Sequence, residues 1–133
     1  MGHSDLNYLI KHMHPELLED RLVFISVSPS ESEPHIPHAR AMVREDEGIT
    51  LVVTTSYADS AHLNYDGVYR QISLAVESDL EAVGLTAAFA TALGKDNIPA
   101  NVIAGYYHDH ILVPESLAEK ALSCLINLTR QST

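Results

Sequence analysis

The stretch ISLAVESDLEAVGLTAAFATALGKDNIPANVIAGYYHDHILVP, residues 72–114, decides the fold because its hydrophobic period changes along its length. It continues a run from Tyr69 in which apolar and smaller or polar residues alternate, which predicts a half-buried strand over 69–76. Apolar residues then recur at helical spacing over 85–93, which predicts an amphipathic helix. Two further apolar runs, separated by polar residues, predict a pair of strands.

Residues that favour the ends of helices and strands divide this stretch. Ser78 or Asp79 is the predicted N-cap of the helix, and Gly94 is its predicted end. Between the last two apolar runs, Tyr107 to His110 is the predicted tight turn. A second amphipathic helix is expected from residue 116 to 128, so the order from Tyr69 is strand, helix, strand, strand, helix. This order predicts an α+β sandwich with helices on one face of a sheet.

The first half of the chain is less regular. Its predicted elements are a helix to about His12 capped by Asp5 or Ser4, a further turn, a buried strand over 21–28, a loop over 29–38, a hairpin around Asp46-Glu47-Gly48 and a short helix capped by Ser56.

Composition limits the classes of function. The chain has 133 residues, 46% of them hydrophobic, and eight Lys and Arg against 18 Asp and Glu give a net charge of -10. Nucleic acid and anionic membranes are therefore poor partners, because both are bound through clustered cations. The longest uncharged apolar stretch, residues 82–93, is too short to cross a bilayer. A single cysteine, Cys124, and the absence of an export signal favour a cytoplasmic location. Cys124 lies in an apolar helical pattern, so its thiol is expected to be buried and unreactive.

The triplet His108-Asp109-His110 permits two interpretations. Histidines two apart on a strand share a face and could bind zinc, copper or nickel, with further ligands from elsewhere in the chain. The simpler interpretation is a strand-connecting turn in which Asp109 accepts backbone hydrogen bonds. The sequence contains no HExxH, CxxC or GxSxG motif and no phosphate-binding glycine loop, so nothing in it predicts an enzyme.

The start of the predicted helix is a second candidate. A helix start exposes backbone N–H groups and the positive end of the helix dipole, which suits a carboxylate. Gly84 would let a ligand approach the backbone there, or it would let the helix pack closely on the sheet.

The segments LEAVGLTAA and NVIAGYYHDHILVP, in this order and at this separation, resemble small bacterial proteins built from ACT domains. Residues 69 to 128 carry most of the resemblance, while LNYLIKHMHPEL and EDEGITLVV are weaker anchors in the first half. The resemblance implies ferredoxin-like βαββαβ units, with antiparallel sheets and helices packed on one face. It also implies two modules, an incomplete one over 1–66 and a more complete one over 67–133, packed as one body.

The resemblance implies a function as well: a non-enzymatic regulatory protein that binds an amino acid or a related metabolite. Its ligand would meet backbone groups of Val83, Gly84 and Leu85 and, across from them, residues 101–103. Those three residues are Asn101, Val102 and Ile103. The negative charge of the protein, rather than the resemblance, indicates that Asp79 or Glu81 would hold the ligand's ammonium group. No cofactor and no metal are expected, and a homo-oligomer is the expected assembly. The alternatives are a metal-binding protein or metalloenzyme using His108, Asp109 and His110, and a purely structural oligomerisation module.

One element of the implied fold is missing from the second half. The chain ends soon after Leu128, which leaves no room for the last strand of a βαββαβ unit. Residues 21–28, coming from the first half, are predicted to fill this place.

Overall fold

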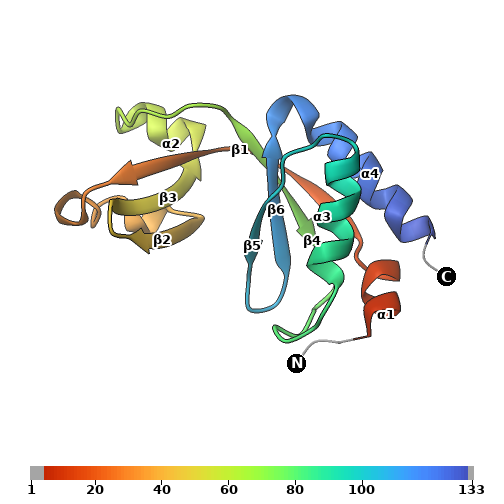
Figure 1. The fold of residues 1–133 in the computed structure, drawn as a ribbon. Helices are drawn as coiled ribbons and strands as arrows, with labels where there is room; N and C mark the ends of the chain where they lie inside the picture. The colour runs from red at the N-terminus through yellow and green to blue at the C-terminus, as the bar shows by residue number, and fades with distance from the viewer. Residues whose placement is uncertain (1–4, 132–133) are drawn as a thin grey trace. The chain divides into compact units, whose positions relative to one another are not determined.

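The computed structural model describes residues 5–131 (Figure 1). Its helices and strands are, in chain order, α1 Leu6–Lys11, β1 Pro15–Val27, β2 Ala41–Glu45, β3 Gly48–Thr54, α2 Thr55–Ser60, β4 Tyr69–Leu74, α3 Leu85–Lys95, β5 Asn101–Ala104, β6 Asp109–Pro114 and α4 Ala118–Gln131. Single 3-10 turns lie at Pro29–Glu31, Ile36–His38 and Glu115–Leu117.

The chain forms two units. The larger unit consists of the described residues up to Glu19 together with those from Arg70 onward, and the smaller unit is Asp20–Tyr69. This grouping in space differs from the expected modules, 1–66 and 67–133, because the first residues of the chain join the second half. The division of the sequence at residue 66 stays a prediction.

The larger unit has the strand order β1-β4-β6-β5. Strands β5 and β6 are antiparallel, with Asn101 opposite Leu112 and Ala104 opposite Asp109. In chain order, β4, α3, β5, β6 and α4 give βαββα, and the first residues of β1 supply the remaining strand beside β4. The side chain of Arg70 fastens the two strands, since its Nε donates to the carbonyl of Leu18 at 2.9 Å. The ferredoxin-like α+β fold is therefore confirmed.

The strand that completes this unit does come from the first half, but the expected segment was wrong. Residues 22–27 pair instead with β3, in the smaller unit, and the part of β1 before Asp20 lies beside β4. The turn expected after His12 is also absent, because β1 already begins at Pro15. Proline can open a strand, since its missing N–H affects only one ladder position there.

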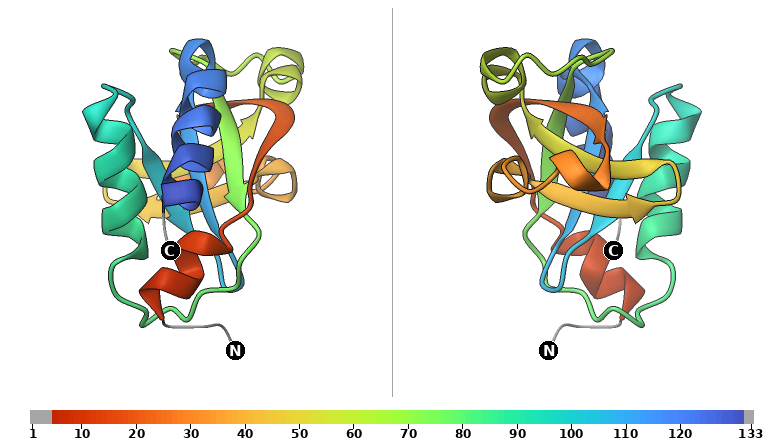
Figure 2. Two further views of the ribbon diagram at one scale, coloured as in Figure 1. Left: turned by 90° about the vertical axis from the view of Figure 1, so that its right-hand side faces the viewer. Right: turned by 90° about the vertical axis from the view of Figure 1, so that its left-hand side faces the viewer.

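Helices α3 and α4 lie on the same face of this sheet, and α1 packs against both of them (Figures 1 and 2). The sheet contributes Ile72, Leu74, Ile111 and Val113 to the core between these layers. The helices contribute buried Leu9, Ile10, Leu85, Phe89, Leu93, Ala118, Ala121 and Leu125. Their spacing in α3 matches the period that the sequence predicted.

The smaller unit has the strand order β2-β3-β1 and its own core, formed by Val23, Ile25, Ile49, Leu51, Val53 and Ala58. The predicted hairpin is confirmed, since β2 and β3 are antiparallel with Glu45 opposite Gly48. Helix α2 begins earlier than expected. Its N-cap is Thr54, whose hydroxyl accepts from the N–H of Tyr57 at 3.1 Å, in place of Ser56.

Both predicted ends of helix α3 were wrong. The N-cap is Gly84, while Asp79 uses its carboxylate within the preceding loop. Gly94 does not end the helix but lies inside it, and the C-cap is Asp96. Glycine in a helix costs only about 1 kcal/mol relative to alanine, and buried Leu93 and Ile98 on either side hold this end of the helix in the core.

Candidate functional site

The loop between β4 and α3 lies at one end of the larger unit and is held by hydrogen bonds both to Met13, which precedes β1, and within the loop itself. The N–H groups of Ala75 and Val76 donate to the carbonyl of Met13, at 2.8 and 3.4 Å. Asp79 then forms a local turn: its carboxylate accepts from the N–H of Glu81 at 3.0 Å, and its carbonyl accepts from the N–H of Ala82 at 2.9 Å. The loop is thus an ordered connection rather than the first turns of the helix.

The turn between β5 and β6 comprises residues 105–108, two residues earlier than predicted. The N–H of Gly105 donates to the carbonyl of His108 at 2.9 Å, and a Cβ at Gly105 would lie only 2.7 Å from that oxygen. Close approach of the backbone therefore fixes the turn at Gly105. Asp109 and His110, which the sequence placed in the turn, are the first residues of β6.

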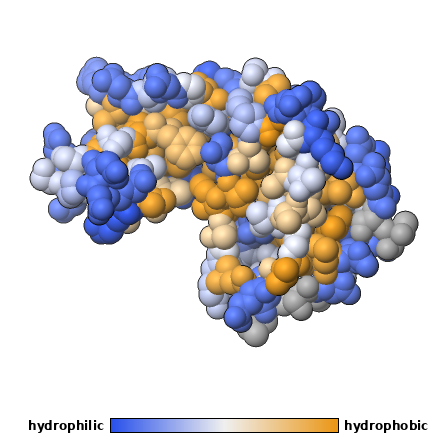
Figure 3. Space-filling view, viewed as in Figure 1, coloured by the Kyte–Doolittle hydropathy of each residue, from blue (hydrophilic) through white to orange (hydrophobic). Residues whose placement is uncertain are grey.

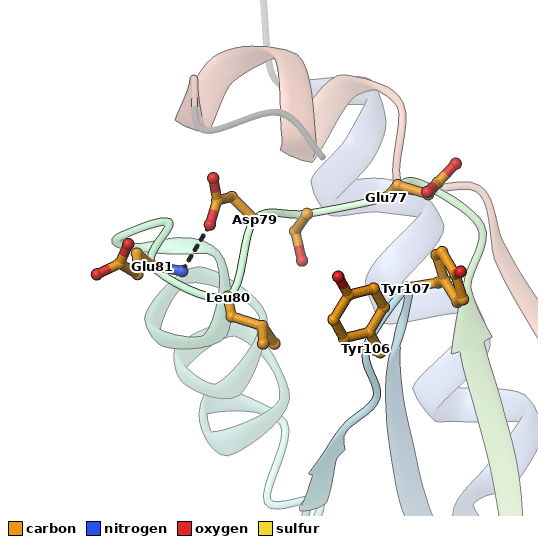
Figure 4. Close-up of a pocket in the computed structure, with 7 residues that line it drawn as sticks. Glu77, Asp79, Leu80, Glu81, Tyr106 and Tyr107 are labelled. Atoms are coloured by element: carbon orange, nitrogen blue, oxygen red, sulfur yellow. Dashed lines mark hydrogen bonds between the residues drawn. The ribbon is translucent and has the colours of Figure 1, made fainter. Parts of the chain in front are cut away.

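A cavity of about 420 Å³ lies between this turn and the loop after β4 (Figure 4). Its lining consists of residues 77–81 from the loop and Tyr106 and Tyr107 from the turn. The ring of Tyr106 faces Leu80 across the cavity, as Figure 4 shows. At the lower end of Figure 3, apolar and hydrophilic side chains lie close together.

The two tyrosines were not singled out from the sequence. Tyr106 is 75% exposed and Tyr107 59% exposed, and their rings meet edge to face with centroids 5.0 Å apart. The sequence did contain a signal for them. Tyrosines usually occur inside strands, where their rings can be buried, so two adjacent tyrosines in the connection after Gly105 indicate exposed rings that could contact a ligand.

Gly84 has a φ of +103° and caps α3 without a side-chain hydrogen bond. The N–H groups of the first helical turn therefore have no side-chain cap at this position. Leu6 lies beside Gly84, since a Cβ added there would meet Leu6 Cδ2 at 3.0 Å. The close neighbour of Gly84 is therefore Leu6 of helix α1, and not the sheet on which the sequence interpretation placed it.

Gly84 and Leu6 also line an open groove of about 670 Å³ along α3 and α4. Most of the α3 residues in its lining are small, namely Ala87, Ala88, Thr91 and Ala92. The groove and the cavity at residues 77–81 share no lining residue. Gly84 therefore lines the groove, whereas Asp79 lines the cavity.

The remaining predicted ligand residues are scattered. Val83 is 83% exposed, whereas Leu85 is buried in the core. Asn101, Val102 and Ile103 lie on β5, at the end of the strand order, and they line neither the cavity nor the groove. The side-chain amide of Asn101 donates to the carbonyl of Leu112 at 3.3 Å. This hydrogen bond holds the Asn101 side chain against the β5–β6 hairpin.

Each side chain of the His-Asp-His triplet has partners of its own, and those of His110 include Gln71 Nε2, at 3.2 Å from His110 Nδ1. His110 Nδ1 lies 2.8 Å from Ser73 Oγ, and His108 Nδ1 lies 3.4 Å from the carbonyl of Val76. Asp109 accepts from Ser78 Oγ at 3.5 Å. Burial raises the pKa of Asp109, while the Ser78 hydrogen bond and the two histidines act in the opposite direction. Within residues 5–131, no three His, Cys, Asp or Glu side chains are placed to hold a metal ion.

Cys124 lies half-buried on α4, in the lining of the groove. Burial, together with a hydrogen bond to Asp96, raises the pKa of its thiol to about 11. A thiol with such a pKa is almost fully protonated at neutral pH and is a poor nucleophile. Among the described helices, none is both long and apolar enough to span a bilayer.

Comparisons with known proteins agree with the fold. Two family models described as ACT domain match the chain, one over residues 1–70 and the other over residues 67–127. The solved structure of VC0802 from Vibrio cholerae, a protein of unknown function described as a possible transport protein, is 44% identical. It covers 93% of this chain and 95% of its own, with a TM-score of 0.83.

More distant structures share the fold alone. Protein Atu0741 from Agrobacterium tumefaciens is 18% identical, with 86% of this chain and 87% of its own covered and a TM-score of 0.72. The regulatory subunit of aspartate kinase from Thermus flavus is 10% identical, with 86% and 95% covered and a TM-score of 0.63. No curated protein matches the sequence significantly. The two family matches, which together extend from residue 1 to 127, show that the chain belongs to the ACT-domain family.

Proposed function

We propose that this protein is a non-catalytic regulator that binds an amino acid or a related small metabolite at the loop between β4 and α3. Membership of the ACT-domain family supports a small-molecule-binding regulatory role. The observation that carries the proposed place is the cavity of about 420 Å³ between residues 77–81 and the β5–β6 turn. Its size lies in the range of small-molecule sites in proteins.

The chemistry of the loop suits a zwitterion. The first turn of α3 offers N–H groups without a side-chain cap and the positive end of an eleven-residue helix, both favourable for a carboxylate. Asp79 supplies a carboxylate for an ammonium group. Since Gly84 and Asp79 line different hollows, a ligand that meets both would have to reach over exposed Val83 between them.

Regulation requires that the bound ligand change a second equilibrium, such as assembly. Strand β5 lies at the end of the strand order, and an edge strand presents unpaired backbone groups to another chain. We include a homo-oligomer in the proposal for this reason, together with a cytoplasmic location, in which the single cysteine would stay reduced.

The competing function is a structural oligomerisation module without a ligand, and Leu6 packed beside Gly84 is the observation that favours it. A thermal-shift screen of the standard amino acids and common metabolites separates the two. A ligand at about 100 times its Kd adds about 2.7 kcal/mol to the free energy of unfolding. In a chain of this size, that raises Tm by several degrees. If no compound raises Tm, the regulatory proposal fails.

Two exposed valines make a matched pair for locating the site. Val83 lies beside the start of α3 and is 83% exposed, while Val43 lies on β2 of the smaller unit and is 55% exposed. V83E places a negative charge beside the helix start and should weaken binding of an active amino acid about two- to five-fold. V43E should leave the affinity unchanged. Equal affinities of the two variants, measured by calorimetry, would place the ligand elsewhere.

A further inference from the structure

The cavity beside the loop has aromatic walls on one side. Tyr106 and Tyr107 both line it, and their rings stand at 83° to each other, so that they present faces in two directions. Both rings are largely exposed, although burying an aromatic ring is normally favourable. Rings arranged in this way can contact a ligand through the negative face of their π-system.

Charge at the rim of the cavity has one sign. Of the seven lining residues, Glu77, Asp79 and Glu81 are acidic and none is basic. Figure 4 shows the three acidic residues along the loop with their carboxylates turned away from the tyrosine rings, while Leu80 points toward Tyr106. Charges at a rim attract a ligand over roughly 10 Å at 0.1 M salt, so their effect depends on ionic strength.

We infer that the effector carries a cationic group on an aliphatic stem, held against the rings of Tyr106 and Tyr107 and beside Leu80. This inference rests on the proposed function and adds the class of ligand to it. A primary ammonium or guanidinium group gains from the ring faces and from the acidic rim, and the stem contacts Leu80. Acidic amino acids are disfavoured, because the same rim repels their second carboxylate.

The test compares pairs of probes that differ in charge and little in shape. L-arginine and L-citrulline form one pair, and L-lysine and Nε-acetyl-L-lysine form the other. Affinities are measured by calorimetry at equal ionic strength, and NMR spectra of the labelled protein locate the bound probe. The expected result is that each cationic probe binds at least about ten-fold more tightly than its neutral partner, with shifts at residues 77–81 and 106–107.

Variants assign the effect to residues. Y106L removes the ring and should weaken binding of L-arginine about three- to ten-fold, whereas Y106F keeps the ring and should not. E81Q should weaken it at low salt and have less effect at high salt. E119Q removes an exposed acid on α4, far along the chain from the cavity, and is the control for net charge. Because Tyr106 and Glu81 are exposed, these substitutions leave the core intact.

The outcomes are separable. Equal affinities for the charged and neutral probes, or a preference for neutral or acidic amino acids, would overturn the cationic class and leave the proposed function standing. A preference for L-arginine that is the same in Y106L, E81Q and E119Q would overturn the assignment to this cavity. If no amino acid binds at all, the proposed function falls and this inference falls with it.

Discussion

At the scale of single residues, Gly84 and Gly94 lie in the same segment and have opposite roles. Gly84 has a φ of +103°, which side chains of L-residues rarely adopt, and a methyl group there would meet Leu6 at 3.0 Å. Gly94 lies exposed inside α3, with nothing within 4 Å of an added Cβ. A substitution at Gly84 therefore tests the effect of backbone strain, and a substitution at Gly94 tests the effect of helix propensity, in the same helix.

Substitution by alanine should change stability in opposite directions at the two glycines. We expect G84A to lower the free energy of unfolding by about 1–3 kcal/mol, because alanine is strained at positive φ. G94A should raise it by about 0.5–1 kcal/mol, since alanine has the higher helix propensity. Urea unfolding measures both. A neutral or stabilising G84A would mean that α3 can begin without the left-handed residue.

The thiol of Cys124 should react slowly in the folded protein. Its pKa of about 11 leaves far less thiolate at pH 8 than an exposed cysteine has. We expect alkylation by iodoacetamide at pH 8 to be at least about ten-fold slower in buffer than in unfolding concentrations of urea. Mass spectrometry follows the modification. Equal rates in the two solutions would show that the thiol is not protected.

The same shift has a consequence for stability at high pH. The pKa of Cys124 is raised on folding, so the contribution of its thiol is present below the pKa of the unfolded state. It is lost as pH rises toward about 11. The fall in the free energy of unfolding between pH 9 and pH 11 should be smaller in C124A than in the parent protein.

At the residue scale, the sequence could identify Gly84 as a special position but could not give its role. Its positive φ depends on how the chain enters α3, and its neighbour Leu6 is 78 positions earlier in the chain. Tyr106 and Tyr107 were missed for a similar reason. They line a cavity only because the β5–β6 turn and the loop after β4 lie at the same end of the unit.

At the scale of elements, helix α1 is short and depends on its cap. Asp5 accepts hydrogen bonds from the N–H groups of Asn7 at 3.0 Å and Tyr8 at 3.5 Å. The helix places Leu9 and Ile10 in the core and packs against α3 and α4. A helix of six residues is unstable by itself, so its cap and its tertiary contacts must hold it in place.

Removal of the cap should therefore be measurable in the stability of the whole larger unit. We expect D5A to lower the free energy of unfolding by about 1 kcal/mol, whereas D5N should be close to the parent protein because asparagine is an equally good N-cap. Thermal and urea unfolding of the three proteins test this. If D5A and D5N behaved alike, the loss would come from charge and not from capping.

The periodic elements were predictable and their ends were not. The helical spacing of Leu85, Phe89 and Leu93 places all three in the core, because the period of a buried face is a local property. Ser78 and Asp79 resembled a helix cap, but Asp79 satisfies the N–H of Glu81 in a turn of its own. The true N-cap, Gly84, has no side chain that could accept a hydrogen bond, so the sequence at that position did not indicate a helix start.

At the scale of the whole molecule, strand β1 takes part in both units. Its residues before Asp20 lie beside β4 in the larger unit, and Leu22 to Val27 pair with β3 in the smaller one. The resemblance implied a βαββαβ unit, of which β4, α3, β5, β6 and α4 supply five elements, so one strand had to come from another segment. The sequence could not show which segment fills the place, because the pairing with β4 joins residues more than 50 positions apart.

This arrangement predicts that the second half does not fold by itself, although a family model matches it as a domain over residues 67–127. A fragment of residues 67–133 lacks β1 beside β4 and lacks α1, which buries Leu9 and Ile10 against α3 and α4. An open sheet edge and an uncovered core should leave it without cooperative unfolding. Circular dichroism and urea titration of the fragment measure this.

The control restores the missing elements without the smaller unit. Residues 5–19 are joined to the end of the fragment through a flexible Gly/Ser linker, which is feasible because α1 packs against α4. This permuted chain should regain helix and strand signals and a single unfolding transition. Its D5A variant should be less stable by about 1 kcal/mol, as in the parent protein. Cooperative unfolding of the 67–133 fragment alone would show that β1 and α1 are dispensable to the unit.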